Sequence, residues 1–186
     1  MSEYLIVIPA RFKSGRLPGK PLKRIDGETM IKRVHDRCTS TGLDTVIATD
    51  DFRIVKECTD NDMEFIMTSE HCLTGTDRVA DAASIKTKQY AGYINVQGDE
   101  PLVNPEDILK IVAVKKHFPD CVIKGYTEID PHEDPHSLNI PKVIFTEDER
   151  MIYVSRQLLP GSKESSKVPA CFYKAVCIYA FGRNDL

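Results

Sequence analysis

No apolar run in this 186-residue chain approaches the roughly 20 residues that a membrane-spanning helix needs. The first residues, Met1 to Tyr4, lack the basic and apolar regions of a secretory signal peptide. The six cysteines form no CxxC pair and no dense framework, a pattern typical of reduced, mostly buried thiols. We therefore expect a cytoplasmic protein with no membrane partner.

Two common nucleotide-binding signatures are also missing. The segment Gly15–Lys20 is one residue shorter than a Walker A loop, and Pro21 stands where that motif needs Ser or Thr. The chain has no GxGxxG, which argues against a dinucleotide site. The net charge is −3, so the surface is not generally cationic, and we expect no nucleic-acid partner.

Two further kinds of site are disfavoured. The stretch HEDPH holds His132 and His136, but their i, i+4 spacing brings them together only on a helix, and Pro135 opposes a helix there. No cysteine has a plausible His and Asp or Asn partner, so a cysteine hydrolase is not expected.

What the chain does contain is an alternation of short apolar runs and amphipathic stretches over its first two thirds. Strands without polar alternation, separated by helices, indicate parallel βαβ units with helices on both faces of a sheet. The predicted strands are Tyr4–Ala10, Thr45–Thr49, Glu64–Met67 and Tyr93–Gln97. The predicted helices are Thr29–Thr41, one beginning at Asp50-Asp51, Thr76–Lys88 and Asn104–His117.

After residue 120 the rhythm changes, and three longer strands follow with little helix between them: Cys121–Thr127, Lys142–Phe145 and Phe172–Phe181. Two segments read as loops, Ile129–Ser137 and Pro160–Lys167. We predict one α/β domain over residues 1–186, with a mostly parallel sheet and an antiparallel addition after residue 120.

The most informative loop follows the first strand. The stretch IPARFKSGRLPGKPL places Arg11, Lys13, Arg16 and Lys20 within ten residues, and these cations repel one another unless an anion binds there. Gly15 and Gly19 allow close backbone approach, while Pro18 and Pro21 stiffen the segment. A stiff cationic loop after a buried strand favours phosphate binding over a merely solvated turn.

Two other polar clusters follow predicted strands, where ligands bind in open α/β sheets. In NVQGDEP, Asp99 is either a turn residue or a carboxylate ligand for Mg²⁺. In HCLTGTDRVAD, Thr74 or Thr76 can cap a helix, Gly75 allows close approach, and Arg78 lies on the first turn.

Together these stretches resemble one family, the cytidylyltransferases that activate 3-deoxy-manno-octulosonate (Kdo). The matching stretches run in the family's order from Ile8 to Phe181: IPARFKSGRLPGKPL, VIATDD, MTSEHCLTGTDR, NVQGDEP, NIPKVIF, YVSRQLLP and CIYAF. The resemblance implies a Rossmann-like nucleotidyltransferase fold. It also implies transfer of CMP from CTP to the anomeric hydroxyl of an acidic sugar, in lipopolysaccharide biosynthesis, with release of pyrophosphate.

The resemblance also assigns the site residues. It makes Lys20 and Asp99 catalytic, gives Asp99 the Mg²⁺ cofactor, and places Gln97 and Tyr179 against the sugar acid. Nucleotide binding is assigned to Ala10, Arg11, Ser14, Arg16, Lys20, Thr74, Gly75, Thr76 and Arg78, of which Arg78 and the Thr74–Thr76 turn are expected to read the cytosine.

The chain departs from the family pattern in two places. Many members have a histidine three residues before the IY pair, where this chain has Lys174 or Ala175. A different acceptor, such as another acidic sugar or a phosphonate, therefore stays open. Members also continue for several dozen residues, which hold further sugar contacts, a second metal-binding aspartate and much of the dimer interface. We expect that this chain lacks the carboxyl-terminal segment. A chain that contains the segment is expected to form a homodimer. A CTP-binding chain with little turnover and, more distantly, a glycosyltransferase remain alternatives.

Overall fold

The computed structural model describes residues 3–186 except 14–16, 162, 165–168 and 170. The chain divides into two compact units, which are described separately. The larger unit comprises Met1–Ile123 and Cys177–Leu186, and the smaller unit comprises Lys124–Val176. That residues 1–186 act as one nucleotidyltransferase domain stays a prediction.

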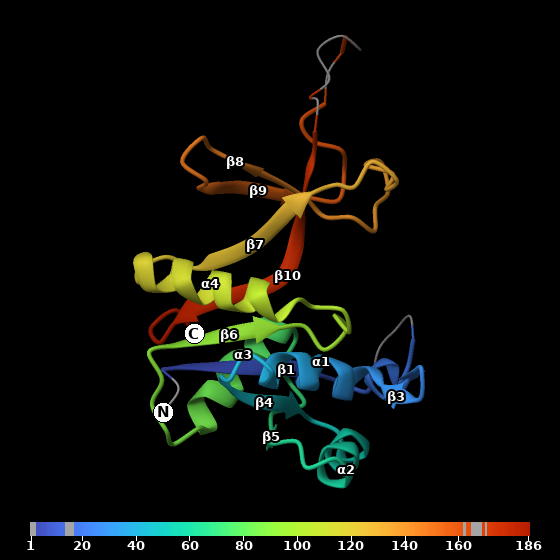
Figure 1. Cartoon of the computed structure of the whole chain (residues 1–186), viewed down its shortest axis with the longest axis vertical. Helices are drawn as coiled ribbons and strands as arrows, with labels where there is room; N and C mark the ends of the chain where they lie inside the picture. The colour runs from blue at the N-terminus through green and yellow to red at the C-terminus, as the bar shows by residue number, and fades with distance from the viewer. Residues whose placement is uncertain (1–2, 14–16, 162, 165–168, 170) are drawn as a thin grey trace. The chain divides into compact units, whose positions relative to one another are not determined.

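The sheet of the larger unit has the strand order β5-β4-β1-β6-β10 (Figure 1). Its strands are β1 (Tyr4–Ala10), β4 (Asp44–Thr49), β5 (Phe65–Met67), β6 (Gly92–Val96) and the carboxyl-terminal half of β10 (Tyr173–Gly182). β1 pairs in parallel with β4 and β6, β4 pairs in parallel with β5, and β10 runs antiparallel to β6. The expected parallel sheet with an antiparallel addition is confirmed.

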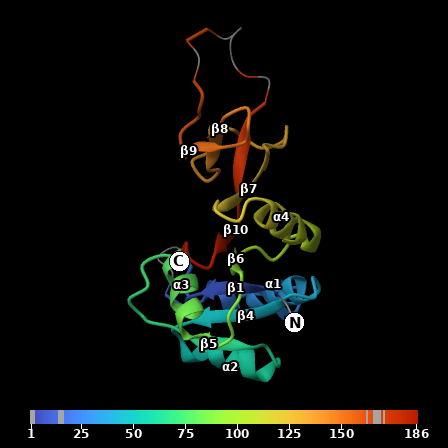
Figure 2. The ribbon, with the colours of Figure 1, turned by 90° about the vertical axis from the view of Figure 1, so that its left-hand side faces the viewer.

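Helices cover both faces of this sheet. Figure 2 shows α1 (Met30–Thr39) and α4 (Pro105–His117) on one face and α3 (Gly75–Ile85) on the other, while α2 (Phe52–Asp60) packs beside β4. All seven residues of β1 are buried, as a central strand covered on both faces requires. The apolar run of β1 is therefore continuous because neither face of this strand meets water.

Each helix begins at a side chain that accepts a backbone N–H. The N-caps are Thr29, Asp51, Thr74 and Asn104, for α1 to α4 in turn. Such caps satisfy N–H groups that have no partner within the helix. The predicted helices are confirmed within a few residues, although α3 ends at Ile85 because the backbone of Lys86 is already extended.

A small element between the first loop and α1 was not predicted. It consists of the 3₁₀ turn η1 (Lys20–Leu22) and the hairpin of β2 (Arg24–Ile25) and β3 (Glu28–Thr29). Asp26 and Gly27 both have positive φ, the conformation that a two-residue hairpin turn requires. Strands of two residues are too short to give a periodic sequence signal.

The smaller unit is an antiparallel arrangement of β7 (Ile123–Glu128), β8 (Lys142–Phe145), β9 (Met151–Ser155) and the first part of β10. The rings of Tyr126, Phe145 and Tyr173 pack together in it. The Lys142 ammonium is buried and donates to the carbonyls of Ser137, Ile140 and Arg156, and desolvation lowers its pKa. These contacts tie the 137–140 loop to the end of β9, a strand that sequence analysis missed.

The described residues contain neither a candidate membrane span nor a cluster of potential metal ligands. No helix there is both long and apolar enough to cross a membrane. No group of three or more His, Cys, Asp or Glu side chains in that part of the chain converges as metal ligands would.

Candidate nucleotide-binding site

Three polar loops leave the same edge of the larger unit's sheet. In the parallel register, Ala10 at the end of β1 lies beside Thr49 at the end of β4, and Val7 lies beside Asn95 of β6. The loops that begin at Arg11, Asp50 and Gln97 therefore meet at the carboxyl edge, where ligands bind in open α/β sheets.

The first and third loops are joined by an ion pair. Lys20 Nζ lies 2.6 Å from Asp99 Oδ2, although 79 positions separate the two residues. Their side chains are 35% and 46% exposed, so both charges remain accessible to a ligand. The two residues predicted to be catalytic are thus neighbours in space.

Arg11 reaches the loop before α3, where its NH1 donates to the Leu73 carbonyl at 3.3 Å. Ser14 and Arg16, which the sequence also assigns to phosphate binding, lie outside the described residues. Ala10 is buried at the last position of β1, so it can offer a ligand only its backbone.

The loop that holds these cations is closed at its base by backbone geometry. Gly19 has a φ of +68°, and its N–H donates to the Phe12 carbonyl at 2.9 Å. Pro21 then lies in the first positions of η1, where a missing N–H costs nothing. The predicted close backbone approach at Gly19 is confirmed, since a Cβ there would come within 3.0 Å of the Phe12 ring. That Pro18 and Pro21 stiffen the loop stays a prediction.

A contact that the sequence did not reveal lies against this loop. The Arg53 guanidinium lies 3.3 Å from the centre of the Phe12 ring. The same guanidinium donates from Nε and NH2 to the two carboxylate oxygens of Asp51, at 2.8 and 2.6 Å. The sequence does not show that Phe12 and Arg53 are in contact, because they lie on different elements that only the fold brings together.

The amino terminus of α3 borders the third loop. Thr74 and Asp77 form a reciprocal capping box, in which each side chain accepts the other residue's backbone N–H. A Cβ at Gly75 would come within 2.9 Å of Gln97 Nε2, so the predicted close approach is confirmed. Thr76 is half-buried in the first turn of this helix.

Arg78 is buried, whereas a residue that recognises the cytosine base directly would be expected to face the ligand site. Its side chain is 2% exposed and donates to Thr68 Oγ1 at 2.5 Å and to Asp50 Oδ2 at 2.9 Å. A buried guanidinium needs such partners to offset its lost hydration. The arginine thereby fixes the loop after β4 against α3, and its contact with cytosine stays a prediction.

The proposed sugar-acid residues lie near each other, since Gln97 directly follows β6 and Tyr179 is on the neighbouring strand β10. Gln97 Nε2 donates to Asn95 Oδ1 at 3.2 Å, and Asn95 lies opposite Tyr179 in the β6–β10 ladder. The Asn95 amide is fully buried, and its Nδ2 has no hydrogen-bond partner among the described residues. Sequence analysis missed Asn95, because a polar residue inside an apolar strand was read only as part of the strand.

Asp99 fits the hard-cation chemistry that the resemblance assigns to it. Its carboxylate is about half exposed at the strand edge, and in the described part of the chain only Lys20 pairs with it. Mg²⁺ is usually held by one or two carboxylates together with substrate phosphates, so a single protein carboxylate next to a cationic loop suffices.

Comparison with known proteins gives one consistent result. A family model described as cytidylyltransferase matches residues 5–185. A 3-deoxy-manno-octulosonate cytidylyltransferase of Fusobacterium nucleatum is 35% identical over 184 residues, which is 98% of this chain and 74% of the relative. An 8-amino-3,8-dideoxy-manno-octulosonate cytidylyltransferase of Shewanella frigidimarina is 34% identical, over 96% of this chain and 74% of that protein.

A solved structure agrees with the two sequence relatives. It is described as CMP:2-keto-3-deoxy-manno-octonic acid synthetase complexed with CTP, and it superposes with a TM-score of 0.88 at 33% identity. The match covers 98% of this chain and 75% of that chain.

Proposed function

Because the chain belongs to the cytidylyltransferase family, we propose that it transfers CMP from CTP to the anomeric hydroxyl of a 3-deoxy-manno-octulosonate-type sugar acid and releases pyrophosphate. The observation that carries the proposal is the accessible Lys20–Asp99 pair at the carboxyl edge of the sheet. A role in the cytoplasmic synthesis of lipopolysaccharide precursors, and a homodimeric state, belong to the same proposal.

The chemistry needs positioning and charge neutralisation. The anomeric hydroxyl oxygen attacks the α-phosphorus and releases its proton to solvent, the bond from that phosphorus to the bridging oxygen breaks, and pyrophosphate leaves with the electron pair. Arg11 and Lys20 supply cations to the phosphates, whose negative charge is redistributed as the bond breaks. Lys20 can donate to a phosphate oxygen while it keeps its partner Asp99, since an ammonium has three donors.

Asp99 would hold Mg²⁺, which neutralises phosphate charge and acidifies a bound hydroxyl when it is present. This assignment agrees with the lack of an obvious general-base histidine among the residues assigned to the site.

The polar residues that follow β6 and those at the start of α3 suit the sugar acid and the cytosine in turn. Gln97 is held by Asn95 and by the bare backbone of Gly75, so its amide has a defined position from which to contact a sugar acid. The Thr74–Thr76 turn and Arg78 would lie against the cytosine, with Arg78 acting through the segment that it fixes.

Two relatives of similar identity are named for different acceptors, one with an 8-hydroxyl and one with an 8-amino group. 8-Amino-3,8-dideoxy-manno-octulosonate is therefore the second candidate for the acceptor. The two differ by one group at the far end of the sugar, whereas the carboxylate and the reacting hydroxyl are the same.

The test is pyrophosphate release with CTP, Mg²⁺ and a panel of three acceptors: Kdo, the 8-amino-3,8-dideoxy acid and N-acetylneuraminate as a different acidic sugar. Release with either of the first two supports the proposal, and the faster of them identifies the acceptor. Release only with the third acceptor, or CTP binding with no release, would overturn the proposed reaction.

A further inference from the structure

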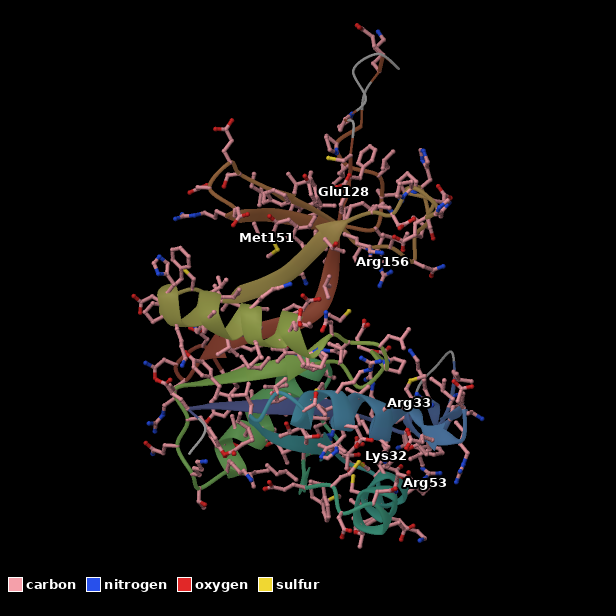
Figure 3. All side chains as sticks on the ribbon, viewed as in Figure 1. Lys32, Arg33, Arg53, Glu128, Met151 and Arg156 are labelled. Atoms are coloured by element: carbon pink, nitrogen blue, oxygen red, sulfur yellow. The ribbon has the colours of Figure 1, made fainter. Side chains whose placement is uncertain are left out.

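Arg53 is the first basic residue of α2, and nothing in the reaction proposed above uses it. Figure 3 labels it at the beginning of that helix, which packs beside η1, the turn that follows the basic loop. Its side chain is 58% exposed, and its guanidinium contacts the Asp51 carboxylate and the Phe12 ring.

The Phe12 ring is the part of the basic loop that Arg53 contacts. The ring lies close to the backbone of Gly19, since a Cβ there would come within 3.0 Å of two of its carbon atoms. The Phe12 carbonyl also accepts the Gly19 N–H. Phe12 and Gly19 therefore close the base of the loop, one residue after Arg11 and one before Lys20.

The guanidinium is held in a fixed orientation over this ring. Its two contacts with Asp51 are parallel, and Asp51 is itself fixed because its Oδ1 accepts the backbone N–H of Arg53 as the N-cap of α2. The Arg53 hydrogen bond lowers the pKa of Asp51, so this carboxylate stays ionised at neutral pH. A planar cation in this orientation stacks on an aromatic ring in a way that a lysine ammonium does not.

We propose that Arg53 is a positioning residue for nucleotide binding: it clamps the Phe12 ring and so holds the Phe12–Gly19 contact, which flanks Arg11 and Lys20. The effect of this clamp on CTP affinity rests on the proposed function. The charge of Arg53 is already matched by Asp51, so the residue acts through Phe12 and not as a phosphate ligand.

The proposal is tested by Arg53→Ala, with Lys56→Ala as the matched control. Lys56 is also a cation of α2, is exposed, and pairs with Asp60, so its removal changes the charge of the helix equally without touching Phe12. Hydrogen exchange of the Gly19 amide in the free protein reports the loop directly. We expect Arg53→Ala to speed this exchange by about two- to fivefold and Lys56→Ala to leave it unchanged.

The same variants are then compared in CTP binding and turnover. Arg53→Ala should weaken CTP binding by about two- to fivefold and raise KM for CTP by the same factor, while kcat at saturating CTP stays unchanged. Arg53→Lys should not restore affinity, because an ammonium can neither stack on the Phe12 ring nor make a bidentate contact with Asp51. Phe12→Leu should weaken binding similarly, and Arg53→Ala should add little to it in the double variant.

The outcomes separate this inference from the proposed function. Unchanged Gly19 exchange in a folded Arg53→Ala protein overturns the clamp, whether or not the chain binds CTP. Faster exchange in a chain that fails to bind CTP supports the clamp and overturns the function. Independent, additive losses from Arg53→Ala and Phe12→Leu would mean that Arg53 contacts phosphate itself, which also overturns the clamp.

Discussion

Charged residues at the carboxyl edge of the sheet are of two kinds. Lys20 and Asp99 form an accessible pair, whose charges a ligand can reach. Arg78 is buried and is committed to Asp50 and Thr68. Removing a member of the first kind should change activity with little change in stability, whereas removing Arg78 would leave the half-buried Asp50 carboxylate unpaired.

The first prediction concerns Asp99. Asp99→Ala should reduce pyrophosphate release by at least about a hundredfold at fixed Mg²⁺, because the carboxylate that would hold the cation at the phosphates is gone. The melting temperature should change by less than about 2 °C, since the pair with Lys20 is exposed to solvent. Asp107→Ala, which removes an exposed acid on α4, is the control. Near-normal release by the Asp99 variant would exclude the metal role.

The second prediction uses the contact between Gly75 and Gln97. Gly75→Ala should raise KM for the sugar acid by about tenfold, because the new methyl group pushes the end of the Gln97 side chain away. The fold should tolerate the change, since that amide is the flexible end of a side chain. Steady-state kinetics and a thermal melt measure the two effects, and an unchanged KM would remove Gln97 from the acceptor site.

Gly92→Ala is the contrasting substitution, because it should reduce stability where Gly75→Ala should not. A Cβ at Gly92 would lie 2.5 Å from the Phe181 carbonyl and 2.8 Å from the Tyr4 ring. This backbone cannot move aside without breaking the sheet, so we expect a loss of about 2 kcal/mol, roughly 6 °C in melting temperature.

Individual elements of the larger unit are anchored by ion pairs at their ends. Asp44 at the start of β4 accepts from Tyr90 Oη at 2.8 Å and from Lys88 Nζ. The hydrogen bond from Lys88 lowers the pKa of Asp44 below its ordinary value of 3.8, in spite of partial desolvation. This strand end is thus joined to the segment between α3 and β6.

The third prediction follows from that pKa. A carboxylate with a lowered pKa in the folded state contributes stability above about pH 4 and loses it as the pH falls through the folded-state pKa. Asp44→Asn should therefore lower the melting temperature by roughly 3 °C at pH 7. This corresponds to about 1 kcal/mol, because Asp44 and Lys88 are each 37% exposed and solvent screens the pair. The deficit should shrink below pH 4, and a deficit independent of pH would show that the charge is irrelevant.

The sequence predicts the helices and the central strands well for a physical reason. Strands covered on both faces are apolar throughout, and the caps Thr29, Asp51 and Asn104 are visible next to them. β9 is harder to find because Met151, Ile152 and Tyr153 are exposed, so no alternation of buried and exposed residues marks it. The β2–β3 hairpin is too short to leave any pattern.

The candidate site also has one part that the sequence predicts and another that it does not. Lys20 and Asp99 stand in loops after buried strands, and the rule that ligands bind at the carboxyl edge brings the two loops together. The Arg53–Phe12 stack and the Gln97–Asn95 bond depend on side-chain directions across different elements. Composition and spacing contain no information about such directions.

At the scale of the whole molecule, the fourth prediction concerns nucleotide choice. CTP at about 100 times its dissociation constant should stabilise the protein by about 2.7 kcal/mol, which for a chain of this size raises the melting temperature by roughly 5–10 °C. UTP at the same concentration should give a smaller shift. A site that hydrogen-bonds the exocyclic amine of cytosine leaves its own polar groups unpaired against uracil.

Thermal melts with CTP, UTP and CMP at equal concentrations measure this preference. The CMP shift serves as the control for the phosphate contribution, since CMP lacks the two outer phosphates. Equal shifts with CTP and UTP would contradict cytosine specificity while leaving triphosphate binding intact.

The pairing of β6 with β10 has a consequence for how the protein is made. Ile178 of β10 pairs with Val96 of β6, about 80 positions earlier in the chain. At the usual rate of synthesis, about 5–20 residues per second, roughly 4–16 s pass between the appearance of the two strands. During that time one edge of β6, a strand of five buried residues, offers its backbone to any other strand nearby. Ribosomes that stall between these two strands should therefore yield aggregates of nascent chains, and a chaperone that covers the edge of β6 should prevent them.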